Sequence, residues 1–132
     1  MNLTKLTMIA SALVLAAAGV AATFLPQEAA ASIGAADAPL VTFLIQILGA
    51  LYVAFAMANW MARESLIGGI YNRALAMANL LHFAIAALAL VKGVAAGQRS
   101  AIVIATAIVY SLFAIAFARV MFTSPVTSSS GS

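Results

Sequence analysis

Residues 40–62 read LVTFLIQILGALYVAFAMANWMA, a run of 23 residues that contains no charged side chain. The hydrocarbon core of a bilayer is about 30 Å thick, and a helix needs roughly 20 mostly apolar residues to cross it. Four runs of this kind occur in the chain, at residues 6–25, 40–62, 74–91 and 101–122. They predict an all-α integral membrane domain over residues 1–122, and the short connections favour a four-helix up-and-down bundle.

The composition supports a membrane protein and excludes a soluble domain. Of the 132 residues, 66% are hydrophobic and 7% are charged, whereas about a quarter of a soluble domain is charged. Cysteine is absent, which excludes disulfides, thiolate metal sites and a cysteine nucleophile. The net charge of +3 comes from basic residues scattered at the ends of the runs, so it forms no nucleic-acid surface. The predicted partner is therefore the lipid bilayer.

The basic residues also predict the orientation, because Lys and Arg in short loops favour the cytoplasmic side. One side of the predicted bundle carries Lys5, Arg63, Arg73 and Arg119. The other side carries Lys92 and Arg99, together with Glu28 and Asp37. This excess of four to two predicts that both termini are cytoplasmic, in a multi-pass protein of the bacterial inner membrane.

Three segments lie around or between these runs. Residues 26–39 begin and end with proline and are rich in alanine, so they predict a short interfacial helix. Lys5, the apolar run after it and the small residues 29–32 imitate a secretory signal, but the length of the run favours a first transmembrane helix. The Ser- and Thr-rich tail, residues 123–132, is expected to be disordered, and its last residues resemble an appended linker.

Polar and small residues recur at steps of three or four along the second and third runs, which places them on one face of each helix. In the second run these residues are Thr42, Gln46, Gly49, Val53, Ala56, Asn59 and Arg63. In the third run they are Asn72, Ala76, Asn79, His82 or Phe83, and Ala86. If the two faces meet, a polar seam leads from Gln46 through His82 to Asn59, and the second and third helices form the main functional pair.

The residues predicted to contact a ligand in this seam are Gln46, Tyr52, Asn59, Asn79, His82 and Tyr110. Inside membranes, amide side chains commonly hydrogen-bond a neighbouring helix, and this packing role is the alternative for the three amides. His82 differs, because an ionisable group at mid-membrane depth marks a functional site by default. We expect its imidazole to be neutral and to hydrogen-bond Tyr52, Tyr110 or a ligand. A structural histidine is the alternative.

A second candidate site is the charge cluster at the predicted cytoplasmic surface. Arg63 and Arg73 flank the connection between the second and third runs, with Glu64 beside Arg63. The sharper interpretation is an anchor for an anion or an anionic lipid head group. The simpler one is that these long side chains extend to the interface and form a loop salt bridge.

Catalysis is not expected from this set of residues. The sequence has no Ser-His-Asp set, no paired carboxylates within the runs, no histidine cluster at metal-ligand spacing and no phosphate-binding glycine loop. A single histidine gives one axial bond to haem unless a second copy supplies the other. No cofactor or metal is therefore predicted.

Several short motifs between Gln46 and Lys92 resemble those of small four-helix bacterial membrane proteins of unassigned function. They are QILGALY at residues 46–52, NWMAR at 59–63, GGIY at 68–71 and NLLH at 79–82. In size and helix count such proteins are similar to the DoxX-type proteins, which are associated with redox or quinone-linked processes. The resemblance implies a quinone-like ligand, concerns architecture only, and transfers no site residues.

The sequence thus predicts a noncatalytic bundle that binds a small amphipathic, lipid-like or quinone-like molecule between the second, third and fourth helices. One alternative is a small channel or carrier formed by several copies, because small-residue faces favour helix association. Another is an accessory subunit of a larger membrane complex.

Overall fold

The computed structural model describes residues 2–64 and 70–123, and all regular structure in these ranges is helical. The helices are α1 (Leu3–Phe24), α2 (Pro26–Ser32), α3 (Pro39–Ala62), α4 (Ile70–Ala95) and α5 (Ala101–Phe122). Each except α2 is long and apolar enough to cross a membrane. The chain is therefore a helical bundle of the multi-pass membrane type, as its apolar runs predict. The predicted disordered tail lies, beyond Thr123, outside the described residues.

The helix ends differ from the ends of the apolar runs for local reasons. Asn2 extends α1 toward the N-terminus, because its side-chain oxygen accepts the Lys5 backbone N–H at 2.8 Å and caps the helix. α4 continues past its apolar run at both ends, since Arg73 and Lys92 can remain helical while their charges reach the head groups. The predicted short helix is α2, which begins at Pro26, where a fixed φ suits the first helical position.

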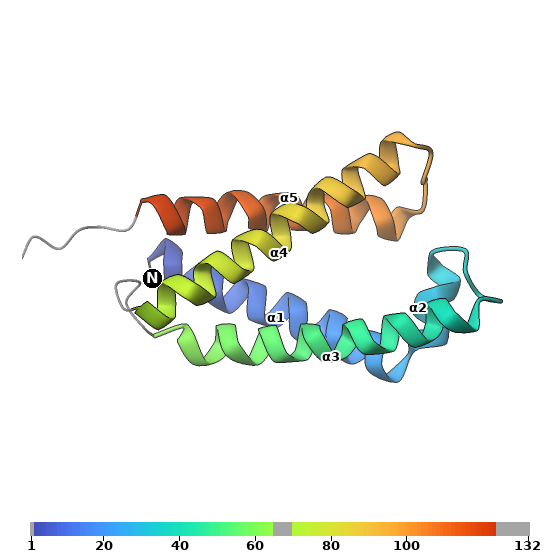
Figure 1. The fold of residues 1–132 in the computed structure, drawn as a ribbon, viewed down its shortest axis with the longest axis horizontal. Helices are drawn as coiled ribbons and strands as arrows, with labels where there is room; N and C mark the ends of the chain where they lie inside the picture. Colours follow the sequence, from blue (N-terminus) through green and yellow to red (C-terminus); the bar gives the residue numbers. More distant parts are fainter. Residues whose placement is uncertain (1, 65–69, 124–132) are drawn as a thin grey trace, which may run out of the picture.

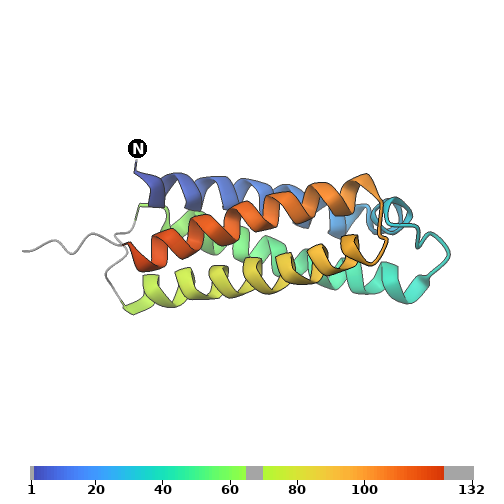
Figure 2. The ribbon, with the colours of Figure 1, turned by 90° about the horizontal axis from the view of Figure 1, so that it is seen from above.

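The four long helices are arranged as two pairs. Successive long helices run in opposite directions along the molecule (Figure 1), and the view from above shows the same alternation (Figure 2). α1 packs along α3 and α4 packs along α5, whereas backbone contacts between these two pairs are few. We call α1 with α3 the first pair and α4 with α5 the second pair. At the end that carries α2, α4 diverges from α3 (Figure 1).

The most extensive packing does not lie between α3 and α4, the helices predicted to form the main functional pair, and it does not test that functional prediction. Each has its most extensive contacts with another helix, α3 with α1 and α4 with α5. α1, which has no ionisable residue after Lys5, contributes the largest share of buried residues, including Met8, Ser11 and Leu15. The reason is that small residues allow the closest backbone approach in α1 and α3, whereas α3 and α4 meet through side chains.

The charged residues lie at the two ends of the bundle. The end that carries the N-terminus has Lys5, Arg63, Glu64, Arg73 and Arg119. The opposite end has Glu28, Asp37, Lys92 and Arg99. Four basic and one acidic residue at the first end account for the whole formal charge of +3. Assignment of that end to the cytoplasm remains a prediction.

Gly19 of α1 and Gly49 of α3 mark the closest approach of the two backbones in the first pair. A β-carbon added to Gly49 would lie 2.6 Å from Thr23 Oγ1 and 2.9 Å from the Thr23 backbone nitrogen. One added to Gly19 would lie 2.9 Å from the backbone nitrogen of Val53. Because backbone atoms cannot move aside as a flexible side chain can, both positions require glycine.

We predict that Gly49→Ala destabilises the bundle by about 1–3 kcal/mol, the usual range for overpacking. Gly93→Ala is the matched control, since its β-carbon would meet only Gln98 Cγ at 3.8 Å. Alanine favours helix over glycine by about 1 kcal/mol, so Gly93→Ala should be neutral or stabilising. Denaturant unfolding in mixed micelles measures both, and equal stability of the two variants would contradict the close approach.

Candidate ligand site between the two helix pairs

The first polar cluster joins the two pairs through Asn59 of α3 and Asn79 of α4, both fully buried. Asn59 Nδ2 donates to Asn79 Oδ1 at 2.8 Å, and Asn79 Nδ2 donates to Asn59 Oδ1 at 2.7 Å. Asn59 Nδ2 also donates to Ser11 Oγ of α1 at 3.0 Å. The reciprocal pair therefore connects three helices, and we call these three residues the amide cluster.

All side-chain donors of the amide cluster are occupied. The second N–H of Asn79 goes to the Leu75 carbonyl at 2.9 Å, and the Ser11 hydroxyl donates to the Met8 carbonyl at 3.1 Å. A buried polar group without a partner costs about 1–3 kcal/mol, so this saturation is what allows two amides to lie in an apolar interior. The cluster has no N–H left for a ligand, and its geometry is that of a contact between helices.

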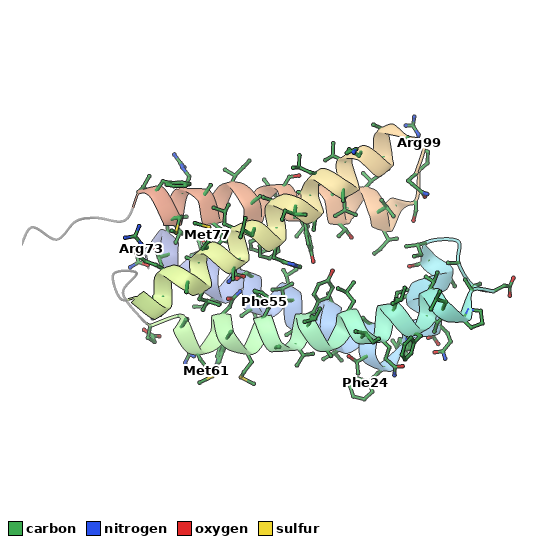
Figure 3. The ribbon with its side chains drawn as sticks, viewed as in Figure 1. Phe24, Phe55, Met61, Arg73, Met77 and Arg99 are labelled. Atoms are coloured by element: carbon green, nitrogen blue, oxygen red, sulfur yellow. The ribbon has the colours of Figure 1, made fainter. Side chains whose placement is uncertain are left out.

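The second polar cluster surrounds His82, which lies close to the middle of α4. His82 Nε2 and the Tyr110 hydroxyl of α5 are 3.3 Å apart. The Phe55 ring of α3 stacks on the imidazole with centroids 5.4 Å apart, and the Tyr52 ring meets it edge-on at 5.8 Å. In Figure 3, Phe55 lies between α3 and α4, whereas Met61 on the same helix points away from the second pair. His82, Tyr52, Phe55 and Tyr110 form what we call the aromatic site.

Phe83 supports the aromatic site from the core of the bundle. Its side chain is fully buried and stands edge-on to Tyr110 with ring centroids 5.0 Å apart. It stacks on Phe117 at 5.6 Å and lies 4.9 Å from Phe113, both on α5. Because closely packed rings leave few alternative rotamers, this core fixes the position of Tyr110. His82 itself remains only half-buried.

Gln46, predicted to continue the seam, lies apart from both clusters. Its side chain is exposed, and its one side-chain hydrogen bond within the described residues runs from Nε2 to the Thr23 carbonyl at 3.4 Å. The thirteen-residue separation from Asn59 places Gln46 about 20 Å away along α3. The polar interior therefore extends from the amide cluster to His82 and stops there, so it is shorter than predicted.

The basic residues at the N-terminal end have partners of their own. The Arg63 side chain donates to the Trp60 carbonyl at 2.6 Å, and its guanidinium lies 4.2 Å from the centroid of the Trp60 ring. Lys5 Nζ lies 2.8 and 2.9 Å from the two carboxylate oxygens of Glu64. This hydrogen bond holds the pKa of the Glu64 carboxyl below its ordinary value. Arg73 is exposed at the same end (Figure 3).

The two clusters allow different chemistry. Within residues 2–64 and 70–123, no group of three His, Cys, Asp or Glu side chains is arranged to hold a metal. The aromatic site offers one imidazole, one phenol and ring faces, which suit hydrogen bonding and stacking with a flat polar head group. The amide cluster, by contrast, holds three helices in fixed positions relative to one another.

Two members of these clusters were not predicted as site residues. Ser11 is a polar residue within the first apolar run, but its partner on another helix cannot be inferred from spacing within one helix. Phe55 lies four residues before Asn59 and three after Tyr52, so its spacing places it on the same face. Phe55 can therefore be predicted from the sequence if aromatic residues on this face are considered together with the polar ones.

We predict that Asn59→Leu or Asn79→Leu alone destabilises the bundle by about 1–3 kcal/mol, because each leaves the other amide buried without a partner. The double variant removes both amides and should cost less than the sum of the single changes. A double-mutant cycle of unfolding in mixed micelles measures the coupling. Strict additivity would contradict the reciprocal pair.

We also predict an acid-sensitive contribution from the bond between Lys5 and Glu64. Since the pKa of Glu64 is lower in the folded state, the carboxylate stabilises the fold above its ordinary pKa of roughly 4, and this contribution is lost as the pH falls through the lowered value. Glu64→Gln and Lys5→Met should each make thermal stability less dependent on pH over that range. An unchanged pH dependence in both variants would argue against the contact.

The chain was compared with family models, with curated proteins and with solved structures. None of the three comparisons finds a match. The likeness to DoxX-type proteins therefore stays a prediction.

Proposed function

We propose that this protein is a noncatalytic bundle of the bacterial inner membrane that binds a small lipid-like molecule at the aromatic site. The head group of this molecule would be flat and would carry a carbonyl, as a quinone does. Its apolar chain would extend between the two helix pairs toward the lipid.

The observation that carries this proposal is the state of the His82 side chain. It lies near the middle of an apolar helix, half-buried, with Tyr110 at 3.3 Å as its only hydrogen-bond partner in the described part of the chain. The second ring nitrogen, Nδ1, is therefore available. A neutral imidazole has one N–H donor and one acceptor, so it can accept from Tyr110 and donate to a ligand carbonyl.

The surrounding rings suit the head group of such a ligand. Phe55 and Tyr52 border the imidazole on the side of the first pair. Offset stacking between aromatic rings contributes about 0.5–1.5 kcal/mol beyond the area that is buried. A flat conjugated head group would gain this contribution together with the hydrogen bond, which a saturated acyl chain cannot.

The amide cluster lies on one side of His82 along α3 and α4. On the other side, toward the end that carries α2, α4 diverges from α3 (Figure 1), and Ser100 Oγ at the start of α5 donates to the Ser32 carbonyl of α2 at 2.9 Å. A ligand chain that extends from His82 in this direction would leave the amide hydrogen bonds intact.

The basic end has an accessory role in this proposal. Arg63 and Arg73 would hold anionic lipid head groups at the cytoplasmic surface, where basic side chains gain about 1 kcal/mol each from anionic lipids. The position of Arg63 over the Trp60 ring is typical of interfacial anchoring.

We predict that the purified protein binds a short-chain prenylated benzoquinone saturably and that His82→Phe weakens this binding about tenfold, or about 1.4 kcal/mol. The substitution keeps a ring against Phe55 and removes the hydrogen bond. Thr106→Val is the matched control, because its hydroxyl donates to the Ile102 carbonyl of its own helix at 2.6 Å. Isothermal titration in lipid nanodiscs measures both variants.

Two results would overturn the proposal. One is a wild-type protein without saturable binding of the quinone. The other is His82→Phe with wild-type affinity. A loss of affinity in Thr106→Val as large as in His82→Phe would also argue against a specific site.

A further inference from the structure

The end of the bundle that carries α2 contains a hollow that the proposed function does not use. Its volume is about 810 Å³, within the usual range for small-molecule sites. It lies between the last turn of α1, the start of α2, the segment before α3 and the first two turns of α3. Its chemically distinctive lining residues are Thr23, Phe24, Asp37, Thr42, Phe43 and Gln46.

The lining has one charged residue, and that residue is acidic. Asp37 is exposed and has no ion-pair partner in the part of the chain that the structure describes. Lys92 lies in the last turn of α4, and Arg99 lies in the connection between α4 and α5 at the same end of the molecule (Figure 3); neither lines the hollow. A carboxylate without a basic neighbour favours a cation in the hollow.

The helix ends around the hollow do not change its preference for a cation over an anion. Helix N-termini attract anions through their free N–H groups. α2 and α3 begin with Pro26 and Pro39, so each lacks an N–H at its first position. The backbone therefore offers an anion less here than an ordinary helix start would.

The remaining lining suits the apolar part of a cationic ligand. The rings of Phe24 and Phe43 are 75% and 58% exposed, and ring faces attract organic cations. Among the described residues, the Gln46 side chain hydrogen-bonds only the Thr23 carbonyl, at 3.4 Å, so its amide can turn toward a ligand. We propose that this hollow binds an alkylammonium group, with Asp37 as the counter-charge and the two rings against its apolar arm.

Dodecyltrimethylammonium is the probe, titrated into the full chain in nanodiscs of phosphatidylglycerol, which has no ammonium group. We expect saturable binding and a Kd at least tenfold weaker in Asp37→Asn, which keeps the shape and removes the charge. Phe43→Leu should weaken binding severalfold. Glu28→Gln is the matched control, because Glu28 is acidic, lies in the neighbouring α2 and does not line the hollow.

Three outcomes would overturn the proposal: no saturable binding, an equal loss in Glu28→Gln, or equal affinity for dodecanol. Nanodiscs that contain phosphatidylethanolamine distinguish two sources of the ammonium group. If this lipid competes with the probe, the natural ligand is a lipid head group. If the lipid does not compete, the ligand is a free amphiphile. Either result supports the alkylammonium site. The His82→Phe variant should bind the probe with wild-type affinity, so the proposals for the hollow and for the aromatic site are tested separately.

Discussion

An amide in hydrocarbon has no water to hydrogen-bond, so Asn59 and Asn79 must satisfy each other or remain unpaired at considerable cost. Their reciprocal hydrogen bonds require a particular depth and rotation of α3 relative to α4. Ser11 extends the same requirement to α1. The register of the two helix pairs, and with it the approach of Tyr52 and Phe55 to His82, follows from this one contact.

The contacts within and between the pairs use different physical chemistry. In the first pair, Gly19 and Gly49 allow the backbones to approach until no β-carbon fits. Between the pairs, long aromatic and amide side chains keep the backbones apart. Close backbone contact maximises dispersion and gives rigidity, whereas a contact through side chains can rearrange by rotamer changes. The candidate ligand site lies in the second kind of contact.

The features that could be predicted from the sequence are those that depend on a single helix. The apolar runs predicted the four long helices, and the three- or four-residue spacing correctly placed Gly49, Ala56 and Asn59, and likewise Ala76, Asn79 and Phe83, on buried faces. Each of these follows from hydrophobic length or from helical periodicity alone.

The pairing of helices could not be obtained in the same way. Spacing shows which face of a helix is inward but not which neighbour that face meets. The closest approach depends on Gly19 and Gly49 lying at the same depth, which the sequence of either helix does not state. Gln46 has the same periodicity as Asn59 but lies in the part of α3 from which α4 has diverged (Figure 1), and its side chain is exposed. The spacing shows on which face of α3 Gln46 lies, but it does not show whether another helix covers that face.

The position of the amide cluster near one end of the bundle has a mechanical consequence. About 20 residues of α3 lie between Asn59 and Pro39, which is a lever of about 30 Å. A rotation of about 5° around the cluster would move the far end of α3 by about 3 Å, while atoms beside the amides would hardly move. A small rotation near the amide cluster is thus amplified at the opposite end of α3, where the hydrogen bond from Ser100 Oγ to the Ser32 carbonyl limits how far the two helix pairs can separate.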